Sequence, residues 1–259
     1  MPALILMYHD VAEDGRGVAP GHRPYVLDRS TFSLQMRSVA AKGLPVLTVR
    51  EWCALSRPPC GIVLTFDDGH VSNCDAAFPI LLEHQLKATF FITVGHIGTG
   101  ETMNWNQIRT LHAAGMEIGS HTLTHRPPST LDDKALRYEL LASRRILEDG
   151  LGAPVTSISS PTGFFNPRMR IIAREVGYRG LCFGQVGLAA DDGDPFSLKR
   201  VAVKRAMRGD QFNALLRFDA VTIRRLRLQQ GMRDFVRKML GPSPYLRIRQ
   251  MLIEGRSTR

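Results

Sequence analysis

The segment IVLTFDDG, residues 62–69, is the part of the sequence that indicates the fold most clearly. It consists of an apolar run, typical of a buried strand, that is followed directly by two acids and a glycine. Its first five residues form a run of the kind that lies inside a parallel sheet with both faces covered. Asp67, Asp68 and Gly69 then end the strand, and Gly69 permits a tight turn. Alone, such a sequence is often only a turn. Its meaning therefore depends on the residues at the ends of the other strands of the chain.

Further apolar runs alternate with amphipathic stretches along the chain. We expect strands at residues 4–8, 88–93, 116–120, 155–159 and 178–183, with a seventh near 198–203. Helices are expected at residues 30–41, 74–84, 105–114, 131–149 and 166–176. Strands that alternate with helices imply parallel pairing with right-handed crossovers. Six or seven such units favour an α/β fold in which a closed or nearly closed β/α barrel forms.

The pattern changes after about Arg208. We expect a barrel domain over residues 1–208 and a basic helical extension over residues 209–259, with two helical stretches joined at 241–244. From residue 219 onward, ten Lys or Arg stand against three acids and supply +7 of the net charge of +10. Two interpretations stay open: a helix packed on the barrel with its arginines outward, or contact with an anionic membrane. No nucleic-acid-binding motif is present, so nucleic acid is not an expected partner.

The composition is that of a globular protein, with 44% hydrophobic and 22% charged residues. The four cysteines form no CxxC pair, which favours reduced thiols in a reducing compartment. Residues 1–11 lack the basic start and the cleavage site of a signal peptide, and no apolar stretch is long enough to span a membrane. We therefore expect a cytoplasmic protein, with peripheral contact at the inner membrane face under the second interpretation of the extension.

Polar or turn-forming groups follow four of the expected strands, and in a parallel barrel they would meet at one rim. They are His9 and Asp10, Asp67 and Asp68, His121 and His125, and residues 160–163. A helical turn would place His121 and His125 on one face, since they are four residues apart. Each pattern alone has an ordinary structural explanation, such as a turn or surface histidines. Their coincidence at successive strand ends favours a site.

A carboxylate beside two histidines would complete the three-ligand, open form of a catalytic metal site. Neighbouring side chains diverge, so both aspartates cannot easily bind one small ion. We expect Asp68 to bind the ion and Asp67 to take a proton from its water. One divalent ion is expected, and Zn²⁺ is favoured, although mixed nitrogen and oxygen ligands admit other metals.

At these residues the sequence resembles the polysaccharide deacetylase family, carbohydrate esterase family 4, also called the chitooligosaccharide deacetylase homology domain. Residues 65–69 match its TFDDG motif in full, and HTLTH at 121–125 fits H[ST]xxH. Residues 8–11, 88–91 and 115–120 are also similar, so the resemblance spans roughly residues 3–203. It implies a deformed (β/α) barrel of about seven parallel strands that removes N-acetyl groups from sugars. The implied ligands are Asp68, His121 and His125, and the implied base is Asp67.

The chain departs from the family pattern at two points. The third motif often carries an arginine that orients the base, but residues 159–163 read SSPTG. Pro161 and Gly163 keep the turn, and we expect them to contact substrate. The family also supplies a general-acid histidine near the end of the barrel, yet no histidine follows His125. His9 is a candidate replacement, with a core or supporting histidine as the alternative, and a protonated Asp67 is a second candidate donor.

Two further residues, Trp105 and Arg200, each have two possible interpretations. Trp105 lines the sugar cleft or belongs to the core. Arg200 holds a carboxylate or phosphate, or is a solvated arginine, and the second interpretation is favoured.

Three functions remain open from the sequence. The first is a metal-dependent N-deacetylase in polysaccharide or lipid-linked glycan synthesis, acting on an N-acetylated carbohydrate. The second is an amidase for another C–N bond, because the same site would serve other small amides. The third is an inactive sugar-binding or assembly protein, which the missing acid histidine favours.

Overall fold

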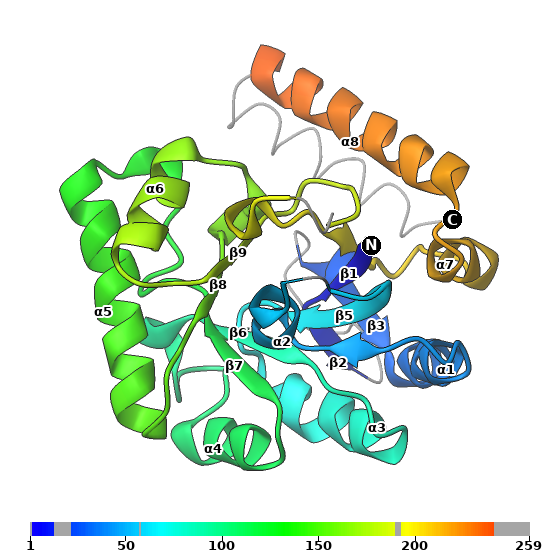
Figure 1. Ribbon diagram of the computed structural model, residues 1–259, viewed down its shortest axis with the longest axis horizontal. Helices are drawn as coiled ribbons and strands as arrows, with labels where there is room; N and C mark the ends of the chain where they lie inside the picture. Colours follow the sequence, from blue (N-terminus) through cyan, green and yellow to red (C-terminus); the bar gives the residue numbers. More distant parts are fainter. Residues whose placement is uncertain (1, 13–21, 57, 190–192, 241–259) are drawn as a thin grey trace.

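The computed structural model describes residues 2–12, 22–56, 58–189 and 193–240, with side chains to residue 235. A curled sheet forms its centre, and its strands follow the order β10-β1-β5-β6-β7-β8-β9, with β4 also paired to β5 (Figure 1). All these pairings are parallel. The strands are β1 (Ala3–Tyr8), β4 (Val46–Leu47), β5 (Gly61–Phe66), β6 (Thr89–Ile92), β7 (Glu117–Ser120), β8 (Ser157–Ser159), β9 (Gly180–Cys182) and β10 (Val201–Ala202).

The two edges of the sheet approach one another through one segment. Leu198 forms a parallel bridge with Cys182 of β9, and three residues later Val201 of β10 pairs with Leu6 of β1. Residues 198–202 therefore link the last strand to the first and nearly close the barrel. The expected deformed barrel of about seven parallel strands, with a helical extension at its C-terminal side, is confirmed.

Helices cover the outside of the sheet (Figure 1). They are α1 (Arg29–Ala40), α3 (Phe78–Glu83), α4 (Trp105–Ala113), α5 (Asp133–Leu151) and α6 (Pro167–Glu175). Capping side chains fix where two of these helices begin. Asp132 caps α5 by accepting a hydrogen bond from the Ala135 amide. Asn166 caps α6, and Pro167 follows it at the first helical position. The expected helix over 74–84 begins instead as a π-helical turn, Asn73–Ala77, that continues into α3.

Some elements were not expected from the sequence. Helix α2 (Val49–Ala54) packs Val49 and Trp52 against Ile5, Val63 and other inward-facing strand residues, so it fills the curve of the sheet. A capping box between Thr48 and Glu51 starts it. A second small sheet pairs β2 (Asp10–Ala12) with β3 (Val26–Asp28). Short 3₁₀ turns occur at Arg23–Tyr25, Val94–His96, Pro128–Thr130, Pro161–Gly163 and Pro195–Ser197.

The C-terminal extension begins with α7 (Gly209–Leu216) and continues with α8 (Ala220–Leu240). The two helices are separated at Phe218, which has a φ of 56° and so interrupts the helical backbone. Phe212 and Leu215 of α7 are buried in the main core of the barrel. The sequence predicted a joint at residues 241–244, which lies outside the described residues, and the boundary at 208/209 stays a prediction. Among the described helices, none is long and apolar enough to cross a membrane.

Candidate metal centre and catalytic base

Asp68, His121 and His125 come together at the carboxyl edge of the sheet. The Asp68 Oδ1 atom lies 3.3 Å from His121 Nε2 and 3.2 Å from His125 Nε2. One ligand atom from each residue lies within 4.8 Å of the other two. Ligands bound at about 2.0–2.1 Å around a tetrahedral ion stand roughly 3.3 Å apart, so the spacing fits one shared ion. The donor set, two imidazoles and one carboxylate, also fits a catalytic zinc site.

The two histidines do not meet on a helix, so that part of the sequence prediction was wrong. Residues 121–125 form an irregular loop after β7. Thr122 and His125 have positive φ angles, 69° and 59°, and these two left-handed residues fold the chain back on itself. The imidazole centroids are 5.0 Å apart as a result. The HxxxH spacing therefore brings both rings together through a strained loop rather than through a helical face.

Glu139 of α5 holds this loop in place. Its carboxylate accepts from the backbone amides of Leu123 and Thr124, each at 2.9 Å, and from the Thr124 hydroxyl at 2.5 Å. The Glu139 side chain is buried. On the strand side, the Ser159 carbonyl lies 3.0 Å from His121 Nδ1, which directs Nε2 toward Asp68. These partners orient the ligands without touching the expected ion.

The Asp68 backbone is itself in the left-handed region, with a φ of 75°, and Gly69 follows with the same value. A side chain on Gly69 would also approach Ile92 Cδ1 to 3.2 Å, so glycine fits here for two reasons. Burial alone would raise the pKa of Asp68, but the imidazoles of His121 and His125 outweigh it and hold that pKa well below its usual value. Asp68 is therefore ionised at neutral pH, as an expected ligand should be.

Asp67 points into the barrel and is bound by Arg200. The Arg200 guanidinium donates to Asp67 Oδ1 and Oδ2, each at 2.7 Å, in a bidentate pair. The Asp67 side chain is 4% exposed and that of Arg200 is 0% exposed. Burial alone would raise the pKa of Asp67, but the guanidinium lowers it below its usual value. The carboxylate is thus ionised and fixed in orientation.

Arg200 is the residue that sequence reasoning missed, because a solvated arginine was the favoured interpretation. It enters the barrel just before β10 and donates from Nε to the Phe183 carbonyl at 3.1 Å. Its guanidinium also lies 5.7 Å from the ring centre of Phe91. The alternative expectation, that Arg200 holds a carboxylate, matches the structure, and that carboxylate is Asp67. The position of Arg200 directly before Val201, inside the expected strand at residues 198–203, was the available signal.

Ser159 connects Asp67, the expected base, to His121, an expected ligand. Its hydroxyl accepts from Arg200 Nη2 at 2.7 Å and donates to Asp67 Oδ2 at 3.3 Å, while its carbonyl accepts from His121. Ser159 opens the SSPTG segment, where the family pattern often has its base-orienting arginine. Arg200 reaches Asp67 from the position just before β10, so the expected base has a cationic partner although residues 159–163 lack one.

His9 lies next to this group at the end of β1. Its Nδ1 atom is buried and has no hydrogen-bond partner among the described residues, and its ring centre lies 4.6 Å from that of Tyr25, with the two rings tilted by 42°. Burial lowers the pKa of His9, and the charges of Asp68 and Asp67 counteract this only in part. Asn73 donates to its carbonyl at 2.6 Å. A neutral imidazole follows from this pKa direction.

The expected substrate-binding turn lies on the same rim. Gly163 has a φ of 71°, and a side chain on it would come within 2.9 Å of Gly184 Cα. The Gly184 amide donates to the Gly163 carbonyl at 2.7 Å, so the turn after β8 is tied to the loop after β9. Pro161 is buried in the turn. Contact of Pro161 and Gly163 with substrate remains a prediction.

Trp105 belongs to the outer helical layer, in agreement with its core interpretation. A Cβ atom on Gly150, in the last turn of α5, would lie 2.2 Å from the Trp105 ring. Arg109 lies 5.5 Å from the ring centre. The ring is therefore engaged between α4 and α5, and its contacts do not support a place in the sugar cleft.

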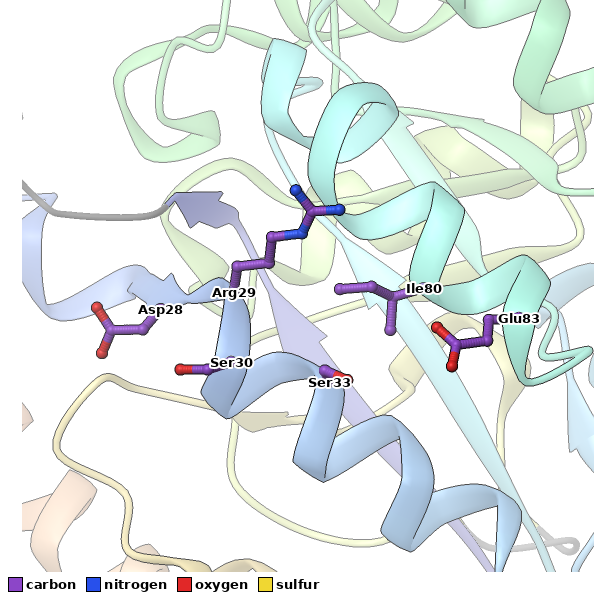
Figure 2. A pocket seen from close by; sticks show the side chains of 6 residues that line it. All are labelled: Asp28, Arg29, Ser30, Ser33, Ile80 and Glu83. Atoms are coloured by element: carbon purple, nitrogen blue, oxygen red, sulfur yellow. The ribbon is translucent and has the colours of Figure 1, made fainter.

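A separate hollow lies between α1 and α3 (Figure 2). It is lined by Asp28, Arg29, Ser30, Ser33, Ile80 and Glu83. None of these belongs to the metal cluster or to the partners of Asp67, and the lining carries charges of both signs. The hollow therefore adds nothing to the site.

The fold is a nearly closed β/α barrel, and the Asp-His-His cluster at the carboxyl edge of its sheet is a candidate metal site. Residues 56–181, just under half of the chain, match the model of the polysaccharide deacetylase family, which is the family that the two motifs resemble. The Bacillus subtilis protein YxkH, a putative polysaccharide deacetylase, is 27% identical over 82% of this chain and 75% of its own length. A peptidoglycan-N-acetylglucosamine deacetylase of Bacillus cereus is 28% identical over 58% of this chain and 69% of its own length.

The fold also has a solved counterpart. The Streptococcus pyogenes deacetylase PplD, determined with acetate, superposes with a TM-score of 0.74. The superposition covers 83% of this chain and 97% of that one at 23% sequence identity. This likeness concerns the fold.

Proposed function

We propose that this protein is a metal-dependent hydrolase that removes an N-acetyl group from a sugar. The observation that carries the proposal is the convergence of Asp68, His121 and His125 beside an ionised Asp67 that Arg200 holds by two hydrogen bonds. Metal-assisted hydrolysis of an amide needs a bound divalent ion and a base next to the water on that ion, and these residues would supply both. The match to the deacetylase family model supports the choice of an acetamide among amides.

The residues have distinct proposed roles. Asp68, His121 and His125 would hold the ion, for which the donor set favours Zn²⁺. A bound zinc ion supplies a Lewis acid and a water whose pKa is lowered to about 7. Asp67 would accept the proton of that water, and Arg200 would keep the carboxylate turned toward it. Ionisation of Asp67 at neutral pH is required for this role, and the lowered pKa of Asp67 supports it.

Two candidates remain for the proton that the leaving amine needs. His9 is close enough to the two aspartates to interact with their charges. Its lowered pKa makes it neutral at pH 7, which favours a positioning role over that of a charged acid. Asp67, once protonated, is the second candidate. Replacing His9 by Gln separates them: loss of turnover by two orders of magnitude or more would favour His9, because general acid catalysis contributes about 10²–10⁴-fold.

The substrate class is proposed as an N-acetylated amino sugar in a polysaccharide or in a lipid-linked glycan. The peptidoglycan-N-acetylglucosamine deacetylase among the relatives supports such a substrate. Pro161 and Gly163 are proposed to contact the sugar, because their turn is joined to the rim next to Ser159.

Acetate release from N-acetylated oligosaccharides, measured together with metal content, tests the proposal. The wild-type protein should release acetate, and Asp67→Asn should abolish release while metal still binds. Loss of metal in Asp67→Asn would show that the division of roles between the two aspartates is wrong. Release from a non-sugar amide alone would instead support the amidase alternative.

One observation favours a second candidate function, an inactive sugar-binding or assembly protein. No histidine follows His125, so the family's usual acid is missing from the sequence. Metal binding together with sugar binding, but without any released acetate, would establish that alternative.

A further inference from the structure

Helix α8 has two faces of opposite character, and its inner face is fixed to the barrel. Ile223 is 5% exposed and belongs to the main core. Gln230 accepts from the Val186 amide and donates to the Gly184 carbonyl, each at 2.7 Å. Arg227 donates to the Val186 carbonyl at 3.3 Å. These contacts seat the helix on the loop that follows β9 (Figure 1).

The outer face carries a stripe of exposed apolar side chains. Val221, Leu228, Met232 and Phe235 are 75%, 61%, 70% and 65% exposed. They follow one another at seven, four and three residues, the spacing of a single helix face. Gln230 lies nine residues after Val221, which is two and a half turns, so it faces the opposite side. Four of the described chain's twelve large exposed hydrophobic residues thus gather on this one surface.

The stripe is set among positive charges. Within α8 there are six basic residues and one acid, Asp234. Of the basic residues with described side chains, Arg224, Arg225, Arg227 and Arg233 are all exposed. Arg225 lies four residues after Val221 and three before Leu228, beside the stripe. An apolar stripe with arginines beside it is complementary to a lipid surface with anionic headgroups. The stripe would lie at the boundary between headgroups and acyl chains, and the guanidinium groups would contact phosphates.

Two other partners could cover the outer face of α8, namely the segment that follows the helix and a second copy of the chain. Electrostatic repulsion disfavours both. The segment after α8, residues 241–259, carries four arginines and one acid. A second copy of the chain would bring the same basic helix. Either occupant would place positive charge next to positive charge, which is unfavourable without compensating acids.

We propose that the outer face of α8, defined by Val221, Leu228, Met232 and Phe235, docks on an anionic lipid surface. The helix lies flat, and its inner face stays on the barrel. Gly184, which accepts from Gln230, also donates to Gly163 in the turn beside the site. Docking therefore holds the catalytic rim close to the bilayer. That last consequence rests on the proposed function, whereas lipid binding itself does not.

Vesicle flotation of the full chain tests the proposal. The vesicles contain phosphatidylcholine alone or with about 30% phosphatidylglycerol. We expect binding to the anionic vesicles only, and weaker binding as salt rises from about 0.1 to about 0.5 M, because exposed charges are screened more strongly. A triple substitution, Leu228→Ser, Met232→Ser and Phe235→Ser, should lower the partition coefficient at least about tenfold, since it removes most of the apolar stripe.

The matched control removes three exposed apolar side chains elsewhere, through Leu34→Ser, Leu82→Ser and Ile171→Ser. It should bind vesicles like the wild type. Thermal melting and zinc content of each variant show that it is folded. Absent binding by the wild type, equal binding to both kinds of vesicle, or equal loss in both triple variants overturns the proposal. So does a wild-type dimer that the stripe substitution converts to a monomer without any change in lipid binding. None of these results depends on acetate release, so failure of the proposed reaction is distinguishable.

Discussion

Asp67 and Asp68 are adjacent in the sequence, yet their surroundings hold them in different ways. The Asp67 side chain is 4% exposed and is fixed by the buried guanidinium of Arg200. The Asp68 side chain is 28% exposed and faces two imidazoles on a loop that Glu139 ties to α5. The first region is a closed charge pair inside the barrel, and the second is an open cluster at its rim. The proposed base would need a fixed orientation and the proposed metal site an accessible position, and the two regions differ in this way.

The largest effect should follow from breaking the buried pair. Arg200→Met leaves the Asp67 carboxylate buried without its partner, and removing one member of a buried ion pair costs about 3–5 kcal/mol. Urea denaturation should report that loss, together with loss of turnover. The control is Arg205→Met, because the pair of Arg205 with Asp28 is 43% and 35% exposed and should contribute at most about 1 kcal/mol.

A second variant keeps this prediction testable if Arg200→Met does not fold. Asp67→Asn combined with Arg200→Met removes the unpaired charge and should recover part of the lost stability. Equal stability of the wild type and Arg200→Met would contradict the closed pair.

Replacing Glu139 should weaken metal binding by the open cluster. Glu139→Gln keeps the size of the side chain but can no longer accept from both amides and the Thr124 hydroxyl with a charged carboxylate. Loss of such an orienting partner typically lowers metal affinity about 10–100-fold. Competition with a zinc chelator measures this. Glu175→Gln is the control, since Glu175 pairs with Arg137 on the exposed surface. Unchanged affinity in Glu139→Gln would mean that the loop holds its shape without α5.

The pH dependence of the reaction tests whether Arg200 sets the ionisation of Asp67. Burial alone raises the pKa of Asp67, and the guanidinium lowers it. Arg200→Lys keeps a charge but loses the bidentate contact, so the pKa of Asp67 should rise. The acid limb of the kcat/KM profile should then move to higher pH, because the base is ionised only above its pKa. Arg205→Lys should leave the limb in place, and an unmoved limb in Arg200→Lys would remove Arg200 from this role.

The smallest effect is expected at Trp105. Trp105→Phe replaces the indole that packs against Gly150 by a smaller ring, so the free energy of unfolding should fall by about 1 kcal/mol. The KM for N-acetylated oligosaccharides should not change. A several-fold rise in KM with unaltered stability would return Trp105 to the sugar cleft.

The same contrast explains what the sequence could predict. The cluster of candidate ligands was predictable because TFDDG and HTLTH are short segments, each at the end of one strand. The Arg200–Asp67 pair was not, since the partners are 133 residues apart and meet only when residues 198–202 nearly close the barrel. Most strands and outer helices were predictable from apolar runs and turn residues. Helix α2 was missed although the Thr48–Glu51 capping box was readable, because a short helix inside the barrel shows no amphipathic period.

The shape of the ligand loop was also beyond the sequence. HxxxH suggested a helix, but Thr122 and His125 adopt left-handed backbone angles. Neither residue is a glycine, and the tertiary contacts to Glu139 and Ser159 hold the loop in that conformation. The sequence therefore named three residues that the fold does bring together, but for a partly wrong local reason.

Anomalous diffraction at the zinc absorption edge, from crystals grown with zinc, tests the central claim most directly. One peak should lie about 2.0–2.2 Å from Asp68 Oδ1, His121 Nε2 and His125 Nε2, with Asp67 outside the coordination sphere. A peak bound by Asp67, or none at these three atoms, would contradict the account.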